Sequence, residues 1–287
     1  MTMVRVGHIG FINCHPLYYG LEQRGMLAEE DTVSGKRKFE LIPGVPTELN
    51  NMLVQAHIDL GPISSIAYAR NHRQLLLSRR LSISSFGAVD SIQVVRKKPL
   101  DKIRSIALTR QSATSAALLK TILKLRFKLE VSYGYLDSSI SDALNSCDAV
   151  LVIGDQGLEA LYFPRPNTNC YDLGQLWKEW TGLPMVYAVW AAREDFAYER
   201  GKELQAVEDE LVECVDYGRK HHAEVVDSAL CRSRLDRAAL GRYFKILRYD
   251  FALEYQQGLQ RFYELAYEAG ELIEVPQLHF IDEVVAQ

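Results

Sequence analysis

The stretch MVRVGHIGFI, residues 3–12, followed directly by NCHPLYYGLEQRG, residues 13–25, decides the fold. The first segment is a short apolar run typical of a buried strand. The second indicates a turn and then a helix, with Pro16 suited to the first helical turn. The same order of strand and helix returns along the chain. Such alternation favours an α/β protein with mixed, mostly parallel sheets and helices on both faces.

Further segments continue this order. We expect a strand that breaks at Gly61-Pro62, and a helix at 45–55 with Thr47 as a cap near its start. The remaining strands are predicted at FELIPG (39–44), in β-rich segments of 74–95, and at 105–109, 129–135, 148–155 and 185–192. A helix is predicted after Gly61-Pro62, in the later part of 57–71, and the remaining helices of this region are predicted at 111–124, 141–146 and 158–163.

The last third of the chain is helical. Residues 199–226 carry one apolar stripe, and residues 250–269 carry a second. We interpret both stripes as core packing; their members are Leu204, Val207, Leu211, Cys214 and Gly218 in the first, and Tyr255, Leu259, Phe262 and Ala266 in the second.

Two sets of strands and helices followed by this tail predict two lobes. The first comprises residues 1–92 and 193–287, and residues 93–192 form an inserted second lobe. Strands near Ser91–Val95 and Met185–Ala191 are expected to join them. The active site is expected in the cleft between the lobes, since hinge closure around a ligand is the standard motion of such an architecture.

Composition and motifs exclude several classes of function. The net charge is −4 and no basic face is evident, so we expect no nucleic-acid partner. No apolar run approaches the ~18 residues of a membrane span, and the N-terminus lacks the features of a secretory signal. Five widely spaced cysteines without a CxxC pair predict a reduced, cytoplasmic chain. No HExxH, GxGxxG or GxSxG motif occurs, so metal, dinucleotide and serine-hydrolase sites have no support.

Open α/β sheets bind ligands beyond the carboxyl ends of their strands. This rule selects five places, which are Asn13–His15, Gly61–Ser65, Ser84–Ser91, Ser112–Ser115 and Gly154-Asp155. The fourth opens a helix, where hydroxyls and unpaired backbone N–H groups could hold a carboxylate. The alternative is that one of these residues only caps the helix.

The other candidates also have two readings. The Asn13 amide could bind a ligand or its own backbone. Asp155 could cap the following helix or face the cleft. His8 and His15 could act as acids or bases, although a lone histidine is more often structural. From residue chemistry alone, the chain is a binder of a small anion and a candidate enzyme.

A family resemblance narrows this reading. VGHIGFINCHPLYYGL (6–21) resembles the opening of the chorismate dehydratases of the futalosine route to menaquinone. The likeness continues in DLGPISSIAYARN, SIALTRQSATSAALL and AVLVIGDQGLEAL, and in DLGQLWKEWTGLPMVYAVWAAR (172–193). It implies a two-lobed periplasmic-binding-protein-like (type II) fold, and an enzyme that removes water from chorismate without a metal or organic cofactor.

The resemblance also implies roles for individual residues. Asn13 and Ser91 match active-site residues of the family. The implied substrate-binding residues are Ser64, Ser112, Thr114, Ser115, Gly154 and Asp155. Two segments depart from the family pattern, Phe86-Gly87-Ala88 and Thr109-Arg110, which leaves the role of Arg110 open. We expect a monomer or a homodimer.

The implied reaction suggests a mechanism in which the substrate assists. Donors at Ser112–Ser115 would stabilise charge on the ring carboxylate, and Asn13 would assist departure of the hydroxyl. The enolpyruvyl carboxylate of chorismate itself would take the proton. The alternatives are a non-catalytic receptor for small carboxylates and the related 1,4-dihydroxy-6-naphthoate synthase. A third alternative is a transcription partner that senses a ligand.

Overall fold

A computed structural model describes residues 3–27 and 39–285. The chain forms two compact units. Unit 1 comprises Met1–Ile83, Ala188–Ala252 and Gln277–Gln287, and unit 2 comprises Ser84–Tyr187 and Leu253–Pro276. The chain passes between the units inside two strands, β4 and β10, and twice more near the C-terminus. These boundaries differ from the predicted lobes chiefly in residues 253–276, which pack with unit 2.

Unit 1 is built on a six-stranded mixed sheet with the order β11-β4-β10-β3-β1-β2. Its strands are β1 (Val4–His8), β2 (Phe39–Pro43), β3 (Leu60–Ser64), β4 (Leu75–Ser85), β10 (Met185–Arg193) and β11 (Leu247–Arg248). Its helices are η1 (Ile12–Cys14), α1 (His15–Gln23), α3 (Pro46–Val54), α4 (Ser65–Asn71), α9 (Glu194–Lys220), α10 (His222–Ala229), η4 (Leu230–Arg232), α11 (Arg237–Ile246) and α13 (Ile281–Val285).

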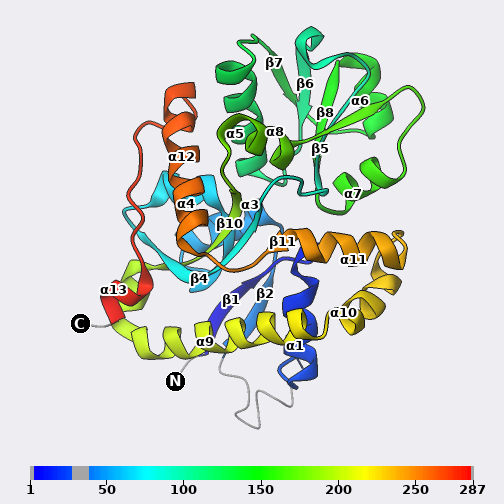
Figure 1. Ribbon diagram of the computed structural model, residues 1–287. Helices are drawn as coiled ribbons and strands as arrows, with labels where there is room; N and C mark the ends of the chain where they lie inside the picture. The colour runs from blue at the N-terminus through cyan, green and yellow to red at the C-terminus, as the bar shows by residue number, and fades with distance from the viewer. Residues whose placement is uncertain (1–2, 28–38, 286–287) are drawn as a thin grey trace. The chain divides into compact units, whose positions relative to one another are not determined.

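The directions of the strands give unit 1 two distinct edges. β1 runs parallel to both β2 and β3, whereas β10 runs antiparallel to β3. The carboxyl ends of β1, β2 and β3 therefore share one edge. Helices α1 and α9 lie side by side below the sheet in the view of Figure 1. A Cβ at Gly218 would lie 2.1 Å from the carbonyl oxygen of Pro16, so glycine is needed for this approach.

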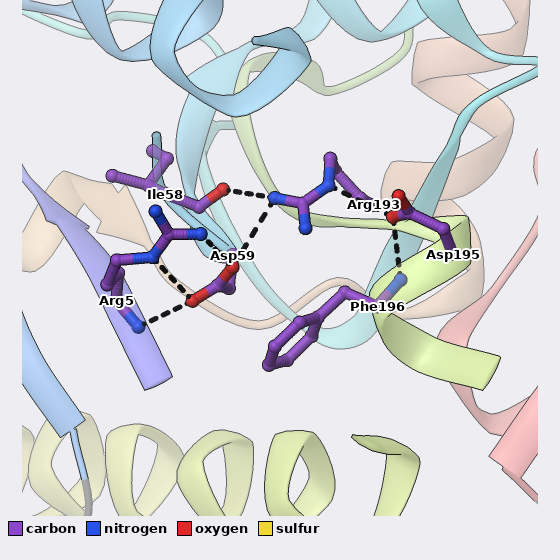
Figure 2. Close-up of polar contacts among 6 residues, drawn as sticks. All are labelled: Arg5, Ile58, Asp59, Arg193, Asp195 and Phe196. Atoms are coloured by element: carbon purple, nitrogen blue, oxygen red, sulfur yellow. Dashed lines mark hydrogen bonds and ion pairs between the residues drawn. The ribbon is translucent and has the colours of Figure 1, made fainter. Parts of the chain in front are cut away.

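The amino-end edge of the unit 1 sheet is held by an ion cluster (Figure 2). Asp59 is 2% exposed and precedes β3. Its carboxylate accepts bonds from the backbone N–H of Arg5 (2.8 Å), from Nε (3.0 Å) and from Nη2 (2.7 Å) of the same residue. Nη1 of Arg193 donates to the same carboxylate (3.3 Å) and to the carbonyl of Ile58 (2.8 Å). These contacts tie β1, β3 and β10 together.

Unit 2 is built on a five-stranded mixed sheet with the order β7-β6-β8-β5-β9. All five residues of β8 are buried, as expected of a strand covered on both faces. Its strands are β5 (Ile92–Arg96), β6 (Ser105–Leu108), β7 (Ser132–Tyr135), β8 (Ala149–Ile153) and β9 (Asn169–Asp172). Its helices are η2 (Leu100–Lys102), α5 (Ala113–Thr121), η3 (Ile122–Arg126), α6 (Ile140–Ser146), α7 (Gly154–Tyr162), α8 (Leu173–Thr181) and α12 (Leu253–Ala269).

The C-terminal helix α12 completes the core of unit 2. Its Phe262 is fully buried and meets the ring of Trp177 edge-on, with 6.1 Å between ring centroids. The predicted stripe of α12 is buried throughout, as is the predicted stripe of α9. The single helix predicted at 199–226 is instead two helices, since α9 ends at Lys220 and α10 begins at His222.

Two local predictions are wrong. The expected strand break at Gly61-Pro62 does not occur, and β3 runs through both residues. β3 pairs with β1 at Leu60, before Pro62, so the missing N–H of proline falls beyond that pairing. Thr47 is also not the cap of α3. The N-cap is Val45, with Pro46 at the first helical position, and the Glu48 carboxylate accepts from the Val45 N–H (3.0 Å).

Candidate functional site

Asn13 lies just beyond the carboxyl end of β1, in the short helix η1. The backbone carbonyl of this residue accepts a 2.8 Å bond from the hydroxyl of Tyr249, which fixes the loop. The side-chain Oδ1 is buried and has no hydrogen-bond partner among residues 3–27 and 39–285. A buried acceptor without a partner is rare in proteins and destabilising unless a ligand satisfies it. Oδ1 therefore does not form the hydrogen bond to its own backbone that was the alternative for this amide.

Ser64 ends β3 at the same edge and is 3% exposed. Its hydroxyl accepts a 2.7 Å bond from Nδ2 of Asn50, and its N–H donates to Oδ1 of the same residue at 2.9 Å. Asn50 belongs to α3, the helix that follows β2. The structure thus brings Asn50 and Ser64 together at this edge, with Ser64 held by two bonds. Sequence reasoning missed Asn50, because it lies inside α3 and not at a strand end.

The two histidines near Asn13 are in different surroundings. His8 ends β1 and its ring packs against Tyr18, with centroids 4.1 Å apart. Burial, and then the charge of Arg232, lower the pKa of His8. His15 opens α1, is 5% exposed, and has its pKa lowered to about 4 by burial and by Arg232. His15 is therefore neutral at pH 7, and its Nε2 lies 2.8 Å from the hydroxyl of Ser228.

In unit 2, the Ser112–Ser115 segment begins α5 directly after β6. Ser112 is the N-cap, and its hydroxyl accepts from the backbone N–H of Ser115 at 3.2 Å. The two hydroxyls also lie 2.9 Å apart. Thr114 and Ser115 are buried, and Ser112 is half-buried. The capping alternative is thus correct for Ser112, and a role in binding stays a prediction.

Ser91 and Gly154 are brought together at the carboxyl end of β8. The antiparallel pairing of Ile92 with Ile153 places the residues before and after them side by side. Helix α7 packs directly on this turn, because a Cβ at Gly157 would lie 2.1 Å from the carbonyl oxygen of Ser91. Ser91 is 5% exposed, and its hydroxyl donates to the carbonyl of Val89 at 3.3 Å.

The turn before Ser91 is held by Asp172, which sequence reasoning missed. This carboxylate accepts from the N–H groups of Val89 (3.1 Å) and Asp90 (2.7 Å), and from Nε2 of Gln93 (2.9 Å). Asp90 adopts a left-handed φ of 57°, which is unfavourable for a residue with a side chain. Burial raises the pKa of Asp172 despite these bonds. Asp172 is thus a half-buried anchor for the Ser91 turn.

Two other charged residues in unit 2 do not lie in buried surroundings. Asp155 is exposed in the first turn of α7, where a carboxylate favours the positive end of the helix. It is not the N-cap, which is Ile153. Arg110 forms two bonds to the carboxylate of Asp137 (2.8 and 3.2 Å) and lies over the ring of Tyr135. In the structure, Arg110 therefore forms a surface ion pair with Asp137.

Two cavities in the described residues lie apart from the predicted side chains. One of about 300 Å³ in unit 1 adjoins Pro16, Arg219 and Tyr249. Another of about 530 Å³ in unit 2 is lined by Lys120, Lys124 and other residues. Residues 3–27 and 39–285 contain no cluster of three side chains suited to hold a metal ion. Nor does any helix in those ranges have the length and apolar character needed to cross a membrane.

Known proteins resemble this chain in sequence and in structure. A chorismate dehydratase of Thermus thermophilus is 28% identical over 268 residues, which are 88% of this chain and 92% of that protein. A chorismate dehydratase of Campylobacter jejuni is 31% identical over 182 residues, 63% of this chain and 64% of that protein.

Among solved structures, a conserved Candida albicans gene product with the generic periplasmic binding protein fold superposes with a TM-score of 0.71. It is 12% identical, and the match covers 100% of this chain and 94% of that one. The predicted fold class is thereby confirmed. The sequence model of a family described as menaquinone biosynthesis matches residues 4–268. The chain therefore belongs to this menaquinone biosynthesis family.

Proposed function

We propose that the protein is a chorismate dehydratase that eliminates water from chorismate to give 3-[(1-carboxyvinyl)oxy]benzoate in menaquinone biosynthesis by the futalosine pathway. The observation that carries this proposal is the similarity to the Thermus thermophilus chorismate dehydratase over 88% of this chain. The five cysteines are free, which supports a cytoplasmic location for the enzyme.

The reaction needs a proton acceptor and help for a departing hydroxyl. The proton leaves the ring carbon that bears the enolpyruvyl ether, the hydroxyl leaves as water, and the ring becomes aromatic. Negative charge develops toward the ring carboxylate through the conjugated diene. Groups that bind this charge more strongly in the transition state than in the ground state accelerate the reaction.

The roles of the site residues follow from their chemistry. The unpaired Oδ1 of Asn13 accepts a hydrogen bond from the substrate, and its amide N–H groups can donate to the departing hydroxyl. Ser91 is the second proposed catalytic residue. Substrate binding is assigned to Ser64 in unit 1, and to Ser112, Thr114, Ser115, Gly154 and Asp155 in unit 2.

The surroundings of His15 favour the substrate as the base. One ring nitrogen of His15 lies 2.8 Å from the hydroxyl of Ser228, and the other lies 3.2 Å from Nη1 of Arg232. Both nitrogens are therefore engaged, and neither offers a free lone pair to a carbon-bound proton. In our proposal the enolpyruvyl carboxylate takes the proton and passes it to the departing hydroxyl, which leaves as water, so the carboxylate is regenerated. The positioning of an intramolecular group can supply about 7–11 kcal/mol.

Incubation of the purified protein with chorismate, followed by chromatography and mass analysis, tests the function. The expected result is 3-[(1-carboxyvinyl)oxy]benzoate formed faster than in a protein-free control. His8→Gln and His15→Gln are expected to retain turnover. Chorismate that is bound and recovered unchanged would favour the receptor alternative. A folded His15→Gln variant that binds chorismate but does not convert it would contradict the role of the substrate as base.

A further inference from the structure

Arg232, at the end of η4 in unit 1, reaches back to the loop that carries Asn13. Its Nη1 lies 3.2 Å from Nδ1 of His15, two residues after Asn13. Burial is the main cause of the lowered pKa of both His8 and His15, and the charge of Arg232 lowers it further. The guanidinium thus acts electrostatically on the end of β1 and on the start of α1.

The hydrogen bonds around His15 define its tautomer. An arginine only donates, so Nδ1 of His15 must accept from Arg232. Nε2 then carries the proton and donates to the hydroxyl of Ser228, which in turn donates to the carbonyl of Val225 at 3.0 Å. Each proton in this series of hydrogen bonds, from Arg232 through His15 to Ser228, therefore has an acceptor. A neutral His15 therefore orients Arg232 without neutralising its charge.

The Arg232 guanidinium has no carboxylate partner in the described ranges 3–27 and 39–285. Other arginines of unit 1, such as Arg5 and Arg193, each pair with a carboxylate. Arg237, for comparison, pairs with Asp227. A guanidinium carries five N–H donors, and the bond to His15 uses one of them. The side chain is exposed, so the remaining donors are accessible. Their planar arrangement matches a carboxylate.

We propose that Arg232 binds a carboxylate of the substrate, and is held by neutral His15 beside the Asn13 loop. The inference rests on the proposed function for the identity of the substrate, since chorismate carries two carboxylates. Arg232 is a binding residue in this proposal, so its loss weakens binding of the dianion and affects the chemical step less.

The test compares Arg232→Gln, Arg232→Lys and the matched control Arg237→Gln. Arg232→Gln is expected to raise KM for chorismate about tenfold to hundredfold, with kcat within about threefold of wild type. Arg232→Lys keeps the charge without the planar fork, so its KM is expected to fall between the two. Arg237→Gln is expected to keep the wild-type KM. Calorimetric titration with isophthalate, a stable aromatic dicarboxylate, is expected to give the same order of affinities.

The outcomes separate this proposal from the proposed function. Turnover of chorismate by wild type, with an unchanged KM in Arg232→Gln, overturns the role of Arg232 and leaves the function standing. If wild type does not convert chorismate, the function fails and the isophthalate titration decides. Weaker binding in Arg232→Gln but not in Arg237→Gln then supports a carboxylate site. Equal affinities, or no binding by wild type, overturn the proposal.

Discussion

The two edges of the unit 1 sheet use polar residues in opposite ways. At the amino-end edge, the Asp59 carboxylate accepts bonds from Arg5 and Arg193, so a buried charge is fully paired (Figure 2). At the carboxyl-end edge, Ser64 and Asn13 carry neutral side chains, and Oδ1 of Asn13 has no partner within the described part of the chain. In the first arrangement, the polar groups form their hydrogen bonds within the protein. In the second, an acceptor is available for a hydrogen bond from a ligand.

The pKa of Asp59 illustrates the first arrangement. Burial alone raises the pKa of this carboxyl, but the hydrogen bonds and charge of Arg5, with the charge of Arg193, lower it below its ordinary value. A buried ion pair of this kind is sensitive to the loss of one partner. In unit 1, the buried charge of Asp59 therefore has a structural role, whereas Oδ1 of Asn13 is a candidate contact for a ligand.

The largest expected effect is on stability at the amino-end edge. Asp59→Asn removes the charge that Arg5 and Arg193 share, so we expect a loss of about 3–5 kcal/mol in the free energy of unfolding. Urea denaturation measures this loss, and kcat of the folded protein should be unchanged. Asp282→Asn is the matched control. It breaks an exposed pair with Arg79, so a change within about 1 kcal/mol is expected. A loss of kcat in folded Asp59→Asn would contradict a purely structural role for the amino-end edge.

The next effect is on turnover at the carboxyl-end edge. Asn13→Ala is expected to reduce kcat about 10²–10³-fold, as for loss of one group that stabilises a transition state. Because Oδ1 has no partner to lose, stability should change by less than about 1 kcal/mol. Steady-state kinetics and urea denaturation measure the two quantities. Asn71→Ala, which removes a bond to the carbonyl of Ala67, should keep the wild-type kcat. A fully active Asn13→Ala would refute the assignment.

The pH dependence of stability sharpens the comparison at His15. Its pKa is 6.5 when unperturbed and about 4 in the folded protein, so below pH 6.5 the unfolded chain binds a proton that the folded chain does not. The contribution of His15 to the free energy of unfolding is therefore constant above pH 6.5. It falls by up to about 3 kcal/mol as the pH drops toward 4. Urea denaturation from pH 7.5 to 4 should show a shallower fall in His15→Gln. Identical slopes in wild type and His15→Gln would contradict the burial argument.

The smallest expected effect separates capping from binding in unit 2. Ser112 and Ser139 are both N-caps whose hydroxyls accept from a backbone N–H at 3.2 Å. Ser112→Ala and Ser139→Ala should each lose about 1 kcal/mol of stability. Only Ser112→Ala is expected to raise KM for chorismate, because Ser139 lies outside the proposed site. Equal KM values in the two variants would leave Ser112 as a cap alone.

Much of the fold could be predicted from the sequence because strand and helix periods are local. The buried strand β1, the strand β8 (Ala149–Ile153) within the predicted range 148–155, and the apolar faces of α9 and α12 all lie where predicted. The association of α12 with unit 2 could not be predicted. It depends on contacts such as Phe262 with Trp177, which no local pattern reveals.

The sequence selects candidate positions for the site, and their part in binding or catalysis stays a prediction. The strand-end rule selects Asn13, Ser64 and Ser112, and each lies beyond or at the end of a parallel strand. Asn50 and Asp172 escaped because hydrogen bonds across the fold, over 14 and 82 residues respectively, give them their roles. Arg232 escaped for the same reason, since 217 residues separate it from His15.

The path of the chain between the units has a consequence for synthesis on the ribosome. Unit 1 receives its last segment from Gln277 onward, and unit 2 receives α12 from Leu253–Pro276. An emerging chain that has passed Ala252 has thus made every strand of both sheets, but it still lacks the segments that finish the two units. We therefore expect that neither unit completes its core during synthesis before the residues from Leu253 onward have been made.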